Sequence, residues 1–138
     1  MKFSEHGSFQ LEANGNIIYC RATGCWNQEA SKTARSALRE CFEKLKGNLI
    51  VIIVDSSEFE GGIEEAYPLW KFELPFWVES GLTHYIRIDD PQSTTYQLFV
   101  ERIDHVIQKI TKFSLANDLD DAIKQAHSYG FTGFESKV

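Results

Sequence analysis

The chain contains one strongly apolar run that passes abruptly into polar residues and then into glycines: Asn48-Leu49-Ile50-Val51-Ile52-Ile53-Val54-Asp55-Ser56-Ser57-Glu58-Phe59-Glu60-Gly61-Gly62. Six apolar residues, most of them β-branched, stand together before Asp55. An edge strand would alternate apolar and polar residues, so this run predicts a strand that is buried on both faces at the centre of a sheet. Ligands and partners gather at the carboxyl ends of such strands. We therefore expect the residues after Val54 to form an exposed, functional loop.

The rest of the chain predicts strands and helices in alternation. Asn14-Gly15 lies between two β-like runs and predicts an antiparallel hairpin, because its turn type needs positive φ at both central residues. Asn27 or Ser31 could cap the first helix, and Asp118 could cap the last. The predicted elements follow in this order: strands 8–13 and 16–24, a helix over about 30–45, strand 49–54, a helical segment 63–80, strand 82–88, helix 94–109, strand 112–116 and helix 119–129.

The segment 63–80 has helical spacing but contains Pro68 and Pro75, which predict a broken or two-part helix. The element order β-β-α-β-α-β-α-β-α predicts an α/β fold. Its single five-stranded sheet is mostly parallel, with an antiparallel N-terminal edge strand and four helices. We expect one domain over residues 1–138, with a core of about 8–129 and a loose tail at 131–138.

The composition excludes several classes of protein. Apolar residues make up 43% and charged residues 25% of the chain, which is ordinary for a globular protein. The net charge of −6 argues against binding to nucleic acid or to an anionic membrane surface. No apolar run is long enough for stable membrane insertion, and the N-terminus has no apolar signal core. The odd count of three cysteines favours reduced thiols, so we expect a cytoplasmic protein.

The element order, together with the motif Val54-Asp55-Ser56-Ser57-Glu58-Phe59-Glu60-Gly61, resembles the STAS-like (SpoIIAA-like) family. The resemblance is to the bacterial branch grouped with STAS and Sec14-type domains. The ending from Phe113 to Ala122-Ile123 is also similar to that branch, and the resemblance covers about residues 8–129. It implies a non-enzymatic regulatory or binding domain, of the kind found in signal transduction.

Anti-sigma-factor antagonists of this family carry a phosphorylatable serine at the start of the helix after the third strand. The position nearest to that serine in this sequence is Gly61 or Gly62, which cannot be phosphorylated. Ser56 and Ser57 are therefore the remaining possible phosphorylation sites. The alternative for Asp55, Ser56 and Ser57 is a turn in which their side chains cap local backbone amides.

Aromatic residues crowd the segment after the predicted loop, and they could line a groove, cover a cavity, form an interface or simply cap the sheet. We predict no metal site, because the histidines lie on separate elements and Asp89-Asp90 has no partner motif. We predict no cofactor and assign no catalytic residues. The candidate partner- or ligand-binding residues are Asp55, Ser56, Ser57, Phe59, Gly61, Gly62, Tyr67, Trp70, Phe72, Phe76 and Trp77.

Three functions remain open at this point. The first is a regulatory module that contacts a protein partner, or a second copy of itself in a homodimer, through the loop after Val54. The second is a carrier or sensor of a small apolar ligand or lipid beneath the aromatic segment 67–77. The third is a small hydrolase or transferase that uses Asp55 and Ser56.

Overall fold

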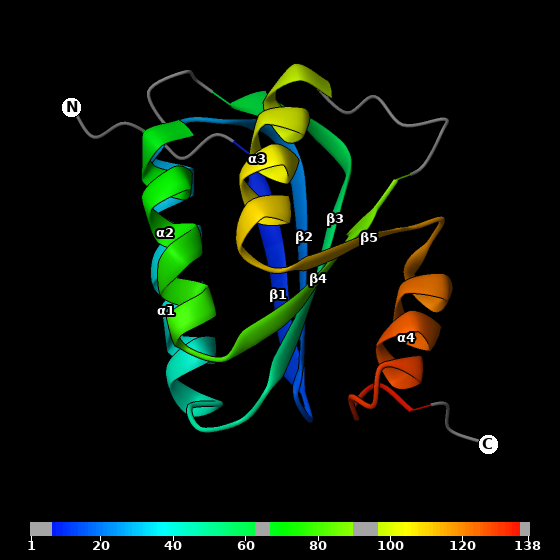
Figure 1. The fold of residues 1–138 in the computed structure, drawn as a ribbon. Helices are drawn as coiled ribbons and strands as arrows, with labels where there is room; N and C mark the ends of the chain where they lie inside the picture. The colour runs from blue at the N-terminus through cyan, green and yellow to red at the C-terminus, as the bar shows by residue number, and fades with distance from the viewer. Residues whose placement is uncertain (1–6, 63–66, 90–96, 136–138) are drawn as a thin grey trace.

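The computed structural model describes residues 7–62, 67–89 and 97–135. The described elements confirm the predicted order of strands and helices (Figure 1). They are β1 (Ser8–Asn14), β2 (Ile17–Trp26), α1 (Gln28–Lys44), β3 (Ile50–Gly62), α2 (Tyr67–Glu79), β4 (Leu82–Ile88), α3 (Gln97–Ile110), β5 (Lys112–Ala116) and α4 (Leu119–Ser128). Of the two predicted caps for the first helix, Asn27 is the one used, and Asp118 caps α4.

The five strands form one sheet in the order β1-β2-β3-β4-β5, with β3 at its centre. β1 pairs antiparallel with β2, and every other pair is parallel, as predicted. Ile50, Val51, Ile52 and Ile53 are completely buried, because helices cover β3 on both sides. Leu49 is the exception within the apolar run: it precedes the strand and is exposed.

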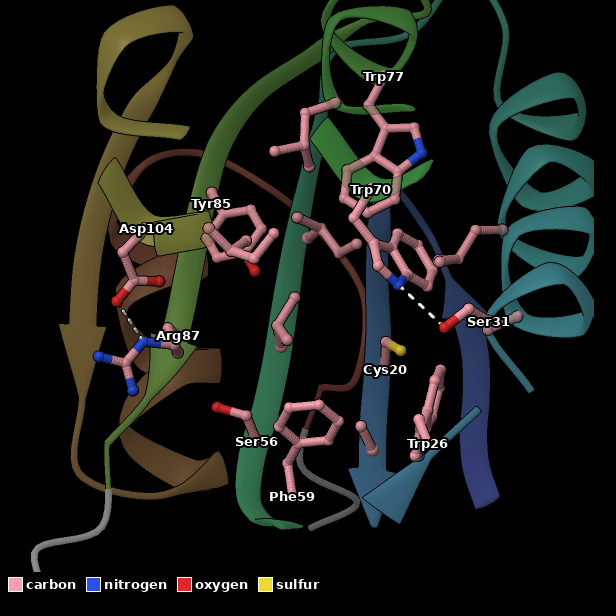
Figure 2. A pocket seen from close by; sticks show the side chains of 17 residues that line it. Cys20, Trp26, Ser31, Ser56, Phe59, Trp70, Trp77, Tyr85, Arg87 and Asp104 are labelled. Carbon is pink, nitrogen blue, oxygen red and sulfur yellow. Dashed lines mark hydrogen bonds and ion pairs between the residues drawn. The ribbon is translucent and has the colours of Figure 1, made fainter. Parts of the chain in front are cut away.

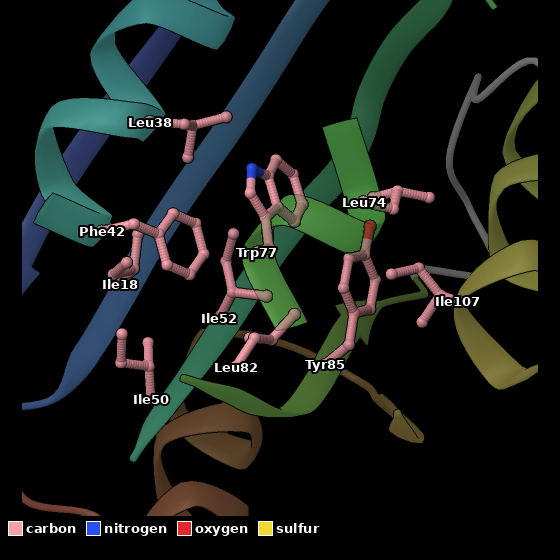
Figure 3. Packing of buried hydrophobic residues seen from close by; sticks show 10 residues of the cluster. All are labelled: Ile18, Leu38, Phe42, Ile50, Ile52, Leu74, Trp77, Leu82, Tyr85 and Ile107. Carbon is pink, nitrogen blue, oxygen red and sulfur yellow. The ribbon is translucent and has the colours of Figure 1, made fainter. Parts of the chain in front are cut away.

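α1, α2 and α3 cover one face of the sheet, and α4 covers the other (Figure 1). On the first face, residues from α1, α2 and α3 pack against alternate residues of the strands, including Ile18, Ile52 and Tyr85. Figure 3 shows this cluster, with Phe42 and Trp77 stacked at a centroid distance of 5.5 Å. On the second face, Ala122 and Ala126 of α4 pack against Ile17, Val51, Ile53, Ile86 and Ile88.

The predicted loop after Val54 is not a loop, because β3 continues to Gly62. β2 also continues, to Trp26, and supplies hydrogen-bonding partners for this extension. The register shifts twice, between Arg21 and Thr23 and between Gly24 and Cys25, and each time one extra residue lies on β3. Such bulges let a polar, glycine-containing segment stay in a sheet. The predicted exposed loop was therefore wrong for residues 55–62.

The predicted break in the next helix was also wrong. α2 runs from Tyr67 to Glu79 with Pro75 inside it. Pro75 is exposed, and a proline inside a helix is tolerated where water can satisfy the carbonyl group that loses its hydrogen bond. An unbroken helix places Trp70, Leu74 and Trp77 at helical spacing on one face, toward the sheet.

The start of the predicted loose tail is packed against the sheet. Phe131 is buried against α4 and the second face, and Thr132 exchanges hydrogen bonds with Asn16. Gly133, with a φ of 135°, lies so close to Asn14 that a Cβ atom would meet its carbonyl oxygen at 1.9 Å. The prediction of a loose tail was therefore wrong for residues 131–135.

An ion pair between an exposed arginine and a buried glutamate joins α1 to α2. Nε and Nη2 of Arg39 donate to the two carboxylate oxygens of Glu73 at 2.8 and 2.9 Å. Glu73 is only 2% exposed, and the guanidinium also lies 4.7 Å from the centre of the Phe76 ring. Removing Arg39 would leave the Glu73 carboxylate at a buried position without its partner.

We expect Arg39→Met to lower the free energy of unfolding by about 1–2 kcal/mol, because it leaves the buried Glu73 carboxylate without its partner, while water already screens the exposed guanidinium. Chemical denaturation measures this change. The double variant Arg39→Met/Glu73→Met should recover most of the loss, and Lys32→Met, at an exposed position of the same helix, should change little. Equal stability of the Arg39 and Lys32 variants would show that the pair does not hold the two helices together.

Candidate functional site

A pocket lies between the sheet and the three helices that cover its first face (Figure 2). Its volume is about 110 Å³. An engineered cavity of about 150 Å³ takes up benzene, so the space corresponds to roughly one ring. The pocket is lined by Cys20, Ala22, Trp26, Ser31, Ala34, Leu38, Ile52, Val54, Ser56, Phe59, Trp70, Leu74, Trp77, Tyr85, Arg87, Ile103 and Asp104.

The pocket exists because small side chains stand where the sheet and α1 face each other. Alternation along β2 turns Cys20 and Ala22 toward the helices, and α1 presents Ser31 and Ala34 to the same space. Larger side chains at these positions would fill the gap. Cys20 is buried, and burial raises the pKa of its thiol to about 12, so this cysteine is an unreactive wall residue.

Aromatic rings form much of the remaining wall. Trp26 lies at centroid distances of 6.1 Å from Phe59 and 6.4 Å from Trp70. Trp70 in turn meets Trp77 edge-on at 6.2 Å, and its indole N–H donates to Ser31 Oγ at 3.3 Å. All three tryptophans of the chain therefore line this one pocket.

A charged pair lies on the opposite side of the pocket from Trp70 (Figure 2). Arg87 of β4 donates from Nε to Oδ2 of Asp104 on α3 at 2.8 Å, and both side chains are largely buried. Nη1 of Arg87 lies 3.5 Å from Oδ1 of Asp89. Burial raises the pKa of the Asp104 carboxyl to about 6, against the opposing effect of Arg87.

Two buried polar atoms on the pocket walls have no hydrogen-bond partner among the residues that the structure describes. One is Oδ1 of Asp104 and the other is Nε1 of Trp77. Buried polar groups in proteins almost always have a partner, so these two atoms mark places where a bound molecule or water is expected. Their residues are 7% and 3% exposed, respectively.

The structure separates the predicted Asp55, Ser56 and Ser57 because neighbouring residues of a strand face opposite sides. Ser56 is buried and lines the pocket. Asp55 interacts on the other side of β3, where its Oδ1 accepts from Ser57 N at 3.0 Å and Ser57 Oγ at 2.6 Å, and Arg21 lies 3.9 Å from Oδ2. Asp55 and Ser57 thus show the local capping that was the alternative to a binding role. Asp55 and Ser56 do not meet in one catalytic site.

The other predicted residues are divided in a similar way. Phe59, Trp70 and Trp77 line the pocket. Phe72 points outward and is 81% exposed, and Phe76 packs beside Arg39. Gly61 and Gly62 end β3, while the side chain of Tyr67 and the residue Asp90 lie outside the part of the chain that the structure describes.

Sequence reasoning missed Trp26, Arg87 and Asp104. The alternation of strand 82–88 could have predicted an inward-facing Arg87, because it places Arg87 on the same side as the buried Tyr85. Asp104 follows Ile103 in an amphipathic helix and reads as an ordinary polar residue. Within the described ranges, no group of three His, Cys, Asp or Glu residues could hold a metal ion.

The raised pKa of Asp104 predicts a pH dependence of stability. Because the folded state holds this proton up to about pH 6 and the unfolded chain only to about pH 4, the contribution of Asp104 falls as the pH rises between these values. We expect the stability of the wild type, relative to Asp104→Asn, to decrease by about 1–2 kcal/mol from pH 4 to pH 7. Urea denaturation at several pH values measures the difference. If the stability difference between the two proteins stays constant or increases with pH, burial is not the main influence on the pKa of the Asp104 carboxyl.

Comparison with solved structures identifies the fold. A protein from Shewanella loihica PV-4, described as an uncharacterized member of the DUF3478 family with a SpoIIAA-like fold, superposes with a TM-score of 0.62. The match covers 91% of this chain and 97% of that chain, at 16% sequence identity. No protein-family model matches the chain, and neither does any curated protein. In the described part of the chain, no helix has the length and apolar character needed to span a membrane. The chain therefore has a SpoIIAA-like fold, as the resemblance of its sequence implied.

Proposed function

We propose that the protein is a binding module, a carrier or a sensor, for a small and mostly apolar molecule that occupies the pocket beneath α2. The observation that carries this proposal is an aromatic pocket of about 110 Å³ between the sheet and α1, α2 and α3. Protein interiors rarely leave such space unfilled, and pockets lined by aromatic rings with a few polar groups are typical of ligand sites. The volume favours a single-ring or short-chain molecule over a lipid.

The residues around the pocket support binding rather than catalysis. The Cys20 thiol has a raised pKa, and Asp55 lies on the other side of the sheet from Ser56. The polar groups at the wall, Asp104 and Arg87, neutralise each other. Such a site can recognise a molecule by shape and by hydrogen bonding. We propose the cytoplasm as the place of action, because Cys20, Cys25 and Cys41 are all free thiols.

Filling the pocket tests this function. Toluene and phenol are suitable probes, and the indole N–H signals of the three tryptophans report on the pocket by NMR. We expect at least one probe to shift these signals in the wild type, and Ala22→Leu to weaken that binding about tenfold or more by occupying the space. Ala13→Leu, at an exposed position, is the matched control. Unshifted signals with both probes in the wild type would rule the proposal out.

A second candidate function is a regulatory contact with a protein partner or with a second copy of this chain. The exposed Phe72 on α2 favours it, because a large aromatic ring that is 81% exposed is typical of an interaction surface. In this function α2 would connect the pocket to the contact surface, since Trp70 and Trp77 line the pocket while Phe72 faces outward.

If Phe72 holds a homodimer, light scattering of the wild type should give twice the mass of one chain, and Phe72→Ser should give the mass of a monomer. Leu49→Ser is the matched control, because Leu49 is also exposed and apolar but precedes β3. A monomeric wild type at high concentration would exclude the homodimer. A dimer that persists in Phe72→Ser would place its interface elsewhere.

A further inference from the structure

The unpartnered oxygen of Asp104 carries information about the kind of molecule that the pocket accepts. Oδ2 of the carboxylate is already held by Arg87 at 2.8 Å, while Oδ1 has no partner among the described residues. In Figure 2, Asp104 stands across the pocket from Trp70, and one of its oxygens is turned away from Arg87. A carboxylate oxygen only accepts hydrogen bonds. A molecule that satisfies it must therefore present a hydroxyl or an N–H group.

The charges around this oxygen favour an uncharged molecule. An anion would face the carboxylate of Asp104, and Arg87 is already paired with Asp104 and with Asp89. A cation at Oδ1 would come close to the Arg87 guanidinium and would lose its hydration among aromatic and aliphatic side chains. A neutral donor avoids both costs, because the ion pair beside it is already compensated.

The remaining walls set the shape of the molecule. Trp26, Trp70 and Trp77 surround a volume of about 110 Å³, enough for roughly one ring. Apart from Asp104 and Arg87, the lining offers few polar side chains: Ser31, Ser56, and the hydroxyl and N–H groups of the aromatic residues. Ser31 already accepts the indole N–H of Trp70. The body of the molecule is therefore mostly apolar, with room for one acceptor toward Nε1 of Trp77, which has no partner among the described residues.

We propose that the pocket selects an uncharged, ring-sized molecule whose apolar body lies among the tryptophans and whose hydroxyl or N–H group donates a hydrogen bond to Oδ1 of Asp104. This proposal rests on the proposed function of the pocket and specifies the ligand class. It makes Asp104 the residue that determines specificity, with Arg87 holding the carboxylate in place from the other side.

Four probes of similar size test the proposal on the wild-type protein at pH 7.5: phenol, toluene, benzoate and benzylammonium. Binding is followed by the indole N–H signals and by calorimetry. We expect phenol to bind about tenfold or more tightly than toluene, because only phenol can satisfy Oδ1, and more tightly than either charged probe. Toluene binding as tightly as phenol, or a charged probe binding most tightly, would overturn the proposed ligand class while leaving the binding function intact. If none of the four probes binds, both proposals fail.

The variant Asp104→Asn provides a second test. Its amide oxygen can accept from Arg87 while its NH₂ group faces the pocket, so the acceptor becomes a donor. We expect phenol to lose its advantage over toluene in this variant. Benzonitrile only accepts hydrogen bonds, and we expect it to bind to this variant more tightly than phenol does. Asp120→Asn, at an exposed position of α4, should keep the preferences of the wild type. An unchanged order of probes in the folded Asp104 variant would contradict the proposed role of Asp104. If that variant does not fold, the four probes on the wild type still decide the question.

Discussion

The covering of β3 on both faces is the constraint on which the rest of the structure depends. Ile50, Val51, Ile52 and Ile53 offer no polar side to water, so both faces of the strand need apolar neighbours. Neighbouring strands protect its edges, and helices must protect its faces. Connections between parallel strands are almost always right-handed. Here the connections from β2 to β3, from β3 to β4 and from β4 to β5 all step in the same direction across the sheet. α1, α2 and α3 therefore lie on one face, and α4 is left to cover the other (Figure 1).

The division of helices between the two faces also explains where the pocket lies. α4 needs only the small Ala122 and Ala126 to approach the sheet closely. On the opposite face, α1, α2 and α3 pack over one sheet, and residues of all three line the pocket. The small side chains of Ala22 and Ala34 leave space in that layer, and the rings of Trp26, Trp70 and Trp77 form much of its wall. The pocket is thus the place where the packing of this layer is incomplete.

Much of the architecture could be predicted from the sequence, because apolar periodicity and turn residues act locally. The order of elements, the Asn14-Gly15 hairpin and the central position of β3 followed from such patterns. The continuation of β3 to Gly62 and the unbroken α2 could not, since partner strand β2 and the open side of Pro75 are properties of the folded molecule. The pocket was foreseen only in part: Trp70 and Trp77 belong to a visible aromatic segment, whereas Arg87 and Asp104 come together only through packing of α3 on β4.

The order of strands in the sheet is the same as their order along the chain, which bears on how the protein folds. Each strand pairs only with strands next to it in sequence, so the sheet can grow one unit at a time as the chain leaves the ribosome. Pairing of strands that follow each other in sequence closes shorter loops than any other strand order would, so less loop entropy is lost at each step. The contact between Asn16 and Thr132 is different, since it joins residues 116 positions apart. It can form only when synthesis is nearly complete, so closure of the second face over the first hairpin is expected to be a late event in folding.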